Sequence, residues 1–147
     1  MRVFLDTNVL VSAFASRGLC AEVLELVLLD HDLILGRNVL CELDKALREK
    51  VKLPVVRSIE IIEFVSSEAT QIVDKAEPAN VNVDAADALV LGEALTSRAD
   101  LFVTGDAALP RLAALGALKI VSPRRFWEVL RAGCVFRTKV TEVSGAT

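Results

Sequence analysis

Two short apolar runs of this chain each lead into a carboxylate, and these acids are the side chains best suited to chemistry. Residues 3–5 are followed by Asp6, Thr7 and Asn8, and residues 101–103 are followed by Thr104, Gly105 and Asp106. Short apolar runs that end in polar turns predict buried parallel strands. Ligands of open α/β sheets bind outside the carboxyl ends of such strands. If the two strands are neighbours, about 5 Å apart, Asp6 and Asp106 can share one metal ion.

A third acidic motif stands at the start of a predicted helix. Asp84 precedes this helix as its expected N-cap, and Asp87 follows three residues later on the same face. An N-cap acid followed by a second acid is close to a capping box, so we interpret Asp84 mainly as a cap, a role that Asp6 could also fill. Asp87 is the better functional candidate. The positive end of a helix dipole favours ionised carboxylates, which a hard cation requires.

Glu42 is the acid whose role the local pattern supports least. It shares the polar face of a predicted helix with three hydrophilic residues, namely Asn38, Lys45 and Glu49. Periodicity alone therefore indicates a surface residue. Only its place early in the helix, after a predicted strand at residues 33–35, puts Glu42 near the same sheet edge as Asp6.

Several acids at one edge repel one another unless a cation neutralises them. Oxygen ligands without histidine or cysteine select Mg²⁺ or Mn²⁺. The single histidine, His31, leaves almost nothing from which to build a histidine base, a catalytic triad or a three-histidine metal site. A pair of such ions about 4 Å apart activates a water and stabilises the leaving oxygen of a phosphodiester. The residues thus indicate metal-dependent phosphodiester hydrolysis.

Strand and helix patterns alternate along the chain and would position these acids. Strands are predicted at residues 3–5, 33–35, 71–73, 101–104 and 119–121, and helices at residues 9–15, 21–29, 39–51, 55–67, 85–97, 107–115 and 124–131. This alternation predicts an α/β protein, a three-layer sandwich whose central sheet is mostly parallel and joined by right-handed crossovers.

Composition limits the class of protein further. The 147 residues fit one domain, and a mean hydropathy of +0.48 suits a sheet covered on both faces, with an oligomer interface as well. Charges interrupt the apolar stretches well before a membrane span of about 20 residues. Three cysteines without CxxC or Cys/His spacing argue against a disulfide framework and a zinc site. We see no signal peptide and expect a cytoplasmic protein.

The charge pattern permits a nucleic-acid substrate without requiring one. The net charge is −3, so the whole molecule is not a polyanion-binding surface. Basic residues cluster in two places: Arg48, Lys50, Lys52 and Arg57, and then Arg124, Arg125 and Arg131. We interpret most of them as solvated helix faces.

Taken together, the motifs resemble those of the PIN-domain family. They are the D-T-N turn of residues 6–8, Glu42 early in the second long helix, Asp87 within D-A-L-V-L-G-E-A-L, V-T-G-D at residues 103–106 and I-V-S-P at residues 120–123. They stand in the expected order over about residues 1–131. The chain looks most like VapC-type ribonucleases, the toxin components of bacterial and archaeal toxin-antitoxin pairs.

The resemblance implies a flavodoxin-like fold and cleavage of RNA by metal-activated water, with an antitoxin as the partner protein. The acidic quartet that would hold Mg²⁺ or Mn²⁺ is Asp6, Glu42, Asp87 and Asp106, and the supporting positions are Thr7, Asn8, Asp84 and Thr104. We expect a nuclease domain at residues 1–131, a homodimer or higher homo-oligomer, and a tail at residues 132–147 that forms an edge strand, pairs with another chain or is partly disordered.

Two other functions remain open at this stage. A PIN-like module could bind a partner protein with weak or no catalysis, since the apolar composition suits a groove for an amphipathic helix. The opening D-T-N also resembles haloacid dehalogenase-type phosphatases. That family requires an acid at the position of Asn8 and another at the position of Pro110, so this reading is less favoured. A magnesium-binding receiver domain lacks both its adjacent acids and its lysine here.

Overall fold

The computed structural model describes residues 1–132, which form a mixed sheet flanked by helices. Six strands lie in the order β3-β2-β1-β4-β6-β5. Their bounds are β1 (Arg2–Leu5), β2 (Asp32–Gly36), β3 (Gln71–Val73), β4 (Leu101–Val103), β5 (Ala114–Leu115) and β6 (Leu118–Val121). All neighbouring pairs are parallel except β5 with β6. The predicted mostly parallel sheet is confirmed.

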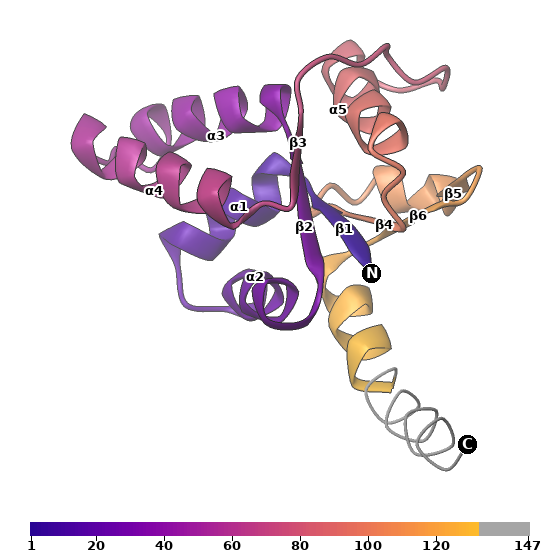
Figure 1. Ribbon diagram of the computed structural model, residues 1–147, viewed down its shortest axis with the longest axis horizontal. Coiled ribbons are helices and arrows are strands. Elements are labelled where there is room, and N and C mark those ends of the chain that lie inside the picture. Colours follow the sequence, from indigo (N-terminus) through magenta and orange to yellow (C-terminus); the bar gives the residue numbers. More distant parts are fainter. Residues whose placement is uncertain (133–147) are drawn as a thin grey trace.

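The helices of the described part are α1 (Thr7–Ala15), α2 (Leu19–Asp30), α3 (Arg37–Glu49), α4 (Val55–Glu68) and α5 (Ala85–Thr96), and residues 123–132 are also helical. Helices α3 and α4 lie on one side of β2 and β3, and α5 lies on the opposite side (Figure 1). Right-handed crossovers explain why the helices lie on opposite faces. From β1 through β2 to β3 the chain moves in one direction across the sheet, and from β3 to β4 it moves in the opposite direction. The three-layer sandwich expected from the sequence is therefore confirmed.

The strand order reverses between β1 and β4, at the centre of the sheet. From β1 the chain builds β2 and then β3 on one side, and it returns to place β4 on the other side of β1. The stacked rings of Phe4 and Phe102, 5.5 Å apart, hold these two strands together in the core. Open α/β sheets bind ligands at the carboxyl edge beside such a reversal. The residues that follow β1 and β4 are thus in the favoured place for a site.

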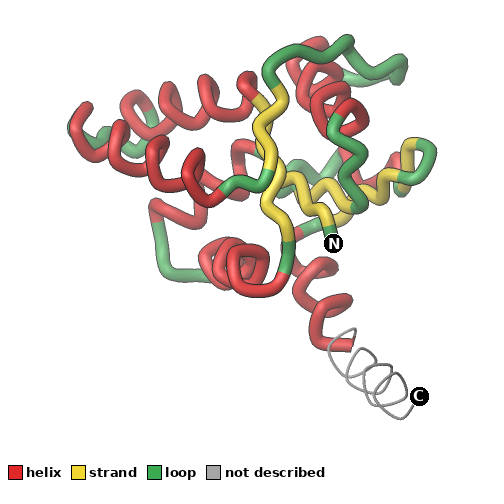
Figure 2. Tube along the Cα trace, in the orientation of Figure 1, coloured by secondary structure: helices red, strands yellow, loops and turns green. Residues whose placement is uncertain are grey.

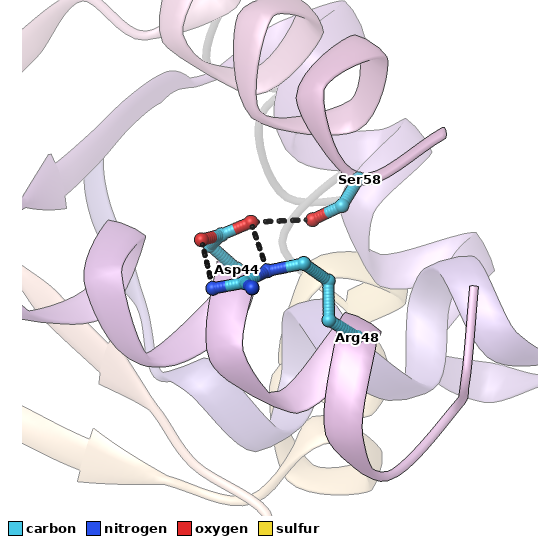
Figure 3. Close-up of polar contacts among 3 residues, drawn as sticks. All are labelled: Asp44, Arg48 and Ser58. Atoms are coloured by element: carbon cyan, nitrogen blue, oxygen red, sulfur yellow. Dashed lines mark hydrogen bonds and ion pairs between the residues drawn. The ribbon is translucent and has the colours of Figure 1, made fainter. Parts of the chain in front are cut away.

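A polar contact fastens α3 to α4 on the same side of the sheet. The hydroxyl of Ser58, on α4, donates a 2.6 Å hydrogen bond to Asp44, on α3, and Arg48 donates two more to the same carboxylate (Figure 3). The hydrogen bond from Ser58 is the largest cause that lowers the pKa of Asp44, and those from Arg48 add to it. Helix α3, which carries Glu42, is therefore fixed against its neighbour by a charged contact as well as by apolar packing.

A long loop joins β3 to α5 and rests on that helix (Figure 2). The backbone N–H of Ala79 donates a 2.8 Å hydrogen bond to the carbonyl of Ala88. A Cβ atom added at Gly92 would lie 1.9 Å from the carbonyl oxygen of Glu77, so only glycine at this helical position allows the close approach. The loop thereby helps to place the N-terminus of α5, where Asp84 and Asp87 lie.

The predicted helix at residues 107–115 is wrong. The chain there makes a turn, a short 3₁₀ helix (Leu109–Leu112) and then β5. The carboxylate of Asp106 accepts a hydrogen bond from the N–H of Ala108, which favours a turn over a helix. Pro110 lacks an N–H, and Ala113 takes a φ of 58°, so an α-helix cannot continue through this segment.

Two further expectations concern the C-terminal tail and membrane-spanning helices. The tail expected at residues 132–147 lies outside the described residues except for residue 132, which is helical. Among the helices of residues 1–132, none combines the length and the apolar character needed to cross a membrane.

Candidate active site

Asp6 lies at the centre of the carboxyl edge of the sheet and is almost fully buried. Its side chain is 6% exposed. It caps α1 by accepting a 2.8 Å hydrogen bond from the N–H of Thr7, and it accepts a second bond of 2.8 Å from the hydroxyl of Thr104, which follows β4. The capping role considered from the sequence is thus real, yet it uses only one of the two carboxylate oxygens. The other oxygen faces the end of β4.

Burial of the Asp6 carboxyl raises its pKa to about 6. The hydrogen bonds from Thr104 and Thr7 oppose this rise, and the negative charges of Asp87 and Glu42 add to it. A carboxylate that is buried, and whose neighbours are acids, gains most from a cation placed beside it. Perturbed acids in a cleft are also a recognised feature of functional sites.

Glu42 is half-buried against α1, which corrects the surface placement that periodicity alone indicates. Its Oε2 atom accepts a 2.8 Å hydrogen bond from the hydroxyl of Thr7. Because Thr7 directly follows Asp6, this bond brings the side chain of Glu42 to the end of β1. The polar face of α3 is therefore turned at this point toward another helix and the candidate site.

The two acids of α5 differ in their surroundings. Asp84 is exposed and accepts a 3.1 Å hydrogen bond from the N–H of Ala86, so the interpretation of Asp84 as the N-cap is confirmed. Asp87 is half-buried, and its pKa is raised first by burial and then by the negative charges of Asp106, Asp84 and Glu42. The carboxylate of Asp87 thus interacts electrostatically with the other carboxylates of the site.

Asn8 and Asp106 define the junction between the turns after β1 and β4. The Oδ1 atom of Asn8 accepts a 2.7 Å hydrogen bond from the N–H of Gly105, and its Nδ2 atom lies 3.4 Å from Asp6. Asp106 is half-buried, and its N–H donates a 3.1 Å hydrogen bond to the hydroxyl of Thr104. The expectation that β1 and β4 are neighbours is confirmed, and their polar turns are hydrogen-bonded to each other.

A cleft of about 610 Å³ opens over this edge, and its lining includes three acids of the predicted quartet, Asp6, Glu42 and Asp87, together with Glu49. Asp106 does not line the cleft, but its negative charge repels that of Asp87, which does. Within residues 1–132, no group of three or more His, Cys, Asp or Glu side chains is close enough to hold a metal ion as placed. The acids therefore share a cleft without closing around one point.

The chemistry of the cleft nevertheless fits a hard divalent cation. The donors are carboxylate, hydroxyl and amide oxygens from Asp6, Glu42, Asp87, Thr7 and Asn8. Such a set without nitrogen or sulfur ligands suits Mg²⁺ or Mn²⁺. Burial is the largest cause that raises the pKa values of Asp6 and Asp87, and the negative charges of neighbouring acids add to the rise. A cation in the cleft would offset both effects.

Sequence reasoning missed one acid near the site, Glu93 on α5. Its side chain is 1% exposed, its Oε2 atom accepts a 3.0 Å hydrogen bond from the N–H of Asn38, and its Oε1 atom has no hydrogen-bond partner within the described residues. Burial is the largest cause that raises its pKa. A glutamate inside the apolar stretch of residues 88–95 was the available signal, because charged residues are rarely fully buried.

Fold and site together define a class: a three-layer α/β domain with an acid-lined cleft at the reversal of strand order. A family model described as "PIN domain" matches residues 2–108, so the chain belongs to the PIN domain family. No curated protein gives a significant match.

Two solved structures show the same fold. One is a crystal structure of VapBC2 from Rickettsia felis bound to a DNA fragment from their promoter, with 17% identity, a TM-score of 0.61, and coverage of 83% of this chain and 98% of that chain. The other is a structure of VapBC-1 from nontypeable Haemophilus influenzae, with 18% identity, a TM-score of 0.61, and coverage of 84% of this chain and 99% of that chain.

Proposed function

We propose that the chain is a metal-dependent endoribonuclease that hydrolyses RNA phosphodiester bonds and acts as the toxin of a toxin-antitoxin pair. The observation that carries the proposal is the convergence of Asp6, Glu42 and Asp87 on one cleft of a PIN domain. These acids come from the turn after β1, from α3 and from α5, and they are separated by long stretches of sequence. A merely structural set of surface acids has no reason to meet at the reversal of strand order.

Asp6, Glu42, Asp87 and Asp106 would hold Mg²⁺ or Mn²⁺ in this cleft. A cation held by these residues would supply an activated water and would stabilise the charge that develops on the phosphate and the leaving oxygen. The side chains of the chain itself prepare the cleft. Thr104 and Thr7 orient the carboxylates of Asp6 and Glu42 by hydrogen bonds of 2.8 Å each.

The rim of the cleft supports a polyanionic substrate. Lys45 of α3 and Lys50, the C-cap of that helix, are exposed, and both line the cleft beside the acids. In this proposal their ammonium groups bind phosphates of the RNA near the scissile bond, since phosphate contacts supply most of the affinity of nucleic-acid binding. Three other basic residues of the clusters, Arg48, Arg57 and Arg125, form ion pairs on their own helices.

A partner protein and a second copy of the chain belong to the same proposal. The solved neighbours are VapBC complexes, and we infer by analogy an antitoxin that binds this chain. Helix α4 exposes several large apolar side chains, namely Val55, Val56, Ile59 and Phe64. Exposed apolar residues in this number on one helix favour a protein interface, for the antitoxin or for a homodimer.

The second candidate function is a protein-binding module with little catalysis. Two observations favour it: the acids do not close around one point within residues 1–132, and an apolar groove of about 500 Å³ runs between α3 and α4. The phosphatase interpretation has no corresponding support. The family match over residues 2–108 is to a PIN domain, and it includes Asn8, where the phosphatase family requires an acid.

Cleavage of RNA in the presence and absence of metal tests the proposed function. Purified protein is incubated with 5′-labelled single-stranded RNA in Mn²⁺ and, separately, in chelator. We expect internal cleavage in Mn²⁺ only, and none by Asp6→Asn. Binding of Mn²⁺ without any cleavage would favour the protein-binding module, and cleavage of equal rate in chelator would exclude a metal-dependent nuclease.

A further inference from the structure

Helix α3, which carries Glu42, begins without a capping side chain of its own. Its N-cap is Gly36, which makes no side-chain hydrogen bond. The first N–H groups of any helix need partners from outside the helix. One of them, the N–H of Asn38, donates a 3.0 Å hydrogen bond to the Oε2 atom of Glu93. The cap of α3 thus comes from α5, a helix on the opposite face of the sheet.

Gly36 is what allows Glu93 to reach this position. A Cβ atom added at Gly36 would lie 2.2 Å from both the Cδ and the Oε1 atoms of Glu93. The φ and ψ of Gly36, −123° and 158°, are extended values that other residues adopt freely. The glycine is therefore needed for space rather than for its backbone, and the space is filled by the carboxyl group of Glu93.

Burying the carboxyl group of Glu93 lowers the stability of the fold. Glu93 is 1% exposed, and its Oε1 atom lacks a hydrogen-bond partner within residues 1–132. An unsatisfied buried polar atom destabilises a fold, because it loses its hydrogen bonds to water and gains none from the protein. An apolar side chain would fit the buried face of α5 without that cost, so the carboxyl group at this position calls for a role other than packing.

The contact links the two helices that bring acids to the cleft. Asn38 precedes Glu42 by one helical turn on α3, and Glu93 follows Asp87 on α5. We propose that Glu93 is a positioning residue that caps α3 and thereby fixes Glu42 relative to Asp87 for binding a divalent cation. The inference rests on the proposed function, since it assigns Glu93 to the same metal-binding cleft.

Titration with Mn²⁺ by isothermal calorimetry tests this role without measuring catalysis. Glu93→Ala removes the cap, and we expect its Mn²⁺ affinity to fall by about 10-fold or more, the usual effect of losing a group that orients a metal ligand. Glu93→Gln keeps an oxygen acceptor for the Asn38 N–H and should bind within about 3-fold of the wild type. The amide of Asn38 should exchange its hydrogen faster in Glu93→Ala alone.

Ser97→Ala, at the C-cap of α5, is the matched control. It deletes a buried hydroxyl that donates to the carbonyl of Ala94 and should lower the melting temperature while leaving the Mn²⁺ affinity unchanged. If Glu93→Ala does not fold, Gly36→Ala displaces the same carboxyl group and should weaken Mn²⁺ binding likewise. Wild-type affinity in the folded Glu93→Ala or Gly36→Ala protein would overturn the positioning role and leave the proposed nuclease intact. Absence of Mn²⁺ binding by the wild type would overturn both.

Discussion

One hydroxyl, that of Thr104, connects the two acids that follow the central strands. It donates a 2.8 Å hydrogen bond to the carboxylate of Asp6 and accepts a 3.1 Å hydrogen bond from the N–H of Asp106. Thr104 is fully buried, so solvent cannot replace either bond. The geometry of both acids therefore depends on this side chain.

Replacing Thr104 with valine should raise the pKa of Asp6 further above its present value, because the hydrogen bond from Thr104 is the largest influence that lowers it. Protons then compete better with the cation, so the loss of Mn²⁺ affinity should be greater at pH 6 than at pH 8. Calorimetric titration at the two pH values measures the effect. Thr104→Ser retains the hydroxyl and serves as the control; equal affinity losses at both pH values would contradict the argument.

The stability of the metal-free protein should depend on pH through Asp6. Its pKa rises from 3.8 to about 6 on folding, so the folded chain binds this proton more tightly than the unfolded chain. The contribution favours folding below pH 4 and is lost as the pH rises through about 6. In chelator at pH 8, Asp6→Asn should therefore be more stable than the wild type, by about 3 kcal/mol, and the difference should vanish at pH 4.

Chemical denaturation at both pH values measures this difference, with Asp44→Asn as a control of opposite sign. The pKa of Asp44 is lowered by its hydrogen bonds from Ser58 and Arg48. Its contribution is present at neutral pH and is lost as the pH falls through the lowered pKa, so Asp44→Asn should destabilise the protein at pH 8. Destabilisation by Asp6→Asn at pH 8 would show that burial does not raise the pKa of Asp6.

Removing the lysines at the rim should weaken RNA binding more than it slows cleavage. Lys45→Ala and Lys50→Ala each delete one cation of the cleft. We expect a higher KM with little change in kcat, and a salt dependence of binding that is shallower by about 0.7 per lost contact on a logarithmic plot. Arg57→Ala makes the same change of charge at a residue paired with Glu60. A rise in KM as large as that of the lysine variants would refute the proposed rim.

Replacing each of the two acids at the start of α5 with asparagine should have different effects on cleavage. Asp87→Asn removes a carboxylate from the cleft and should abolish cleavage. Asp84→Asn leaves an oxygen for the N–H of Ala86, and asparagine caps helices as well as aspartate does, so activity should fall by less than 10-fold and the melting temperature should stay unchanged. The rates of RNA cleavage by the two variants, measured at saturating Mn²⁺, test this prediction. Equal losses in the two variants would mean that the metal site extends to Asp84.

Strand ends made part of the site predictable. Asp6 and Asp106 follow apolar runs that pair as β1 and β4, and the polar turns meet as the parallel arrangement requires. Glu42 was harder, because its helical periodicity indicates solvent, whereas the packing of α3 against α1 turns it toward Thr7. Periodicity reports only the local helix face, and it cannot report which neighbouring element covers that face.

Tertiary contacts also explain the two features that the sequence did not predict. The alanine-rich segment after Asp106 predicts a helix by propensity, yet its turn and the pairing of β5 with β6 prevail. The link from Glu93 to the start of α3 joins residues 55 positions apart, and no local pattern could reveal it. Its only sequence signal was a glutamate among apolar neighbours.

Crystals of the protein soaked in Mn²⁺ provide the most direct test of the shared acidic cleft. Anomalous diffraction at the manganese edge locates the ion without reference to activity. We predict a peak bound by the carboxylates of Asp6 and Asp87, with Glu42 or Asp106 turned toward it, and no peak in Asp6→Asn. A saturated wild-type crystal with no manganese in this cleft, or with manganese bound only elsewhere, would contradict the account.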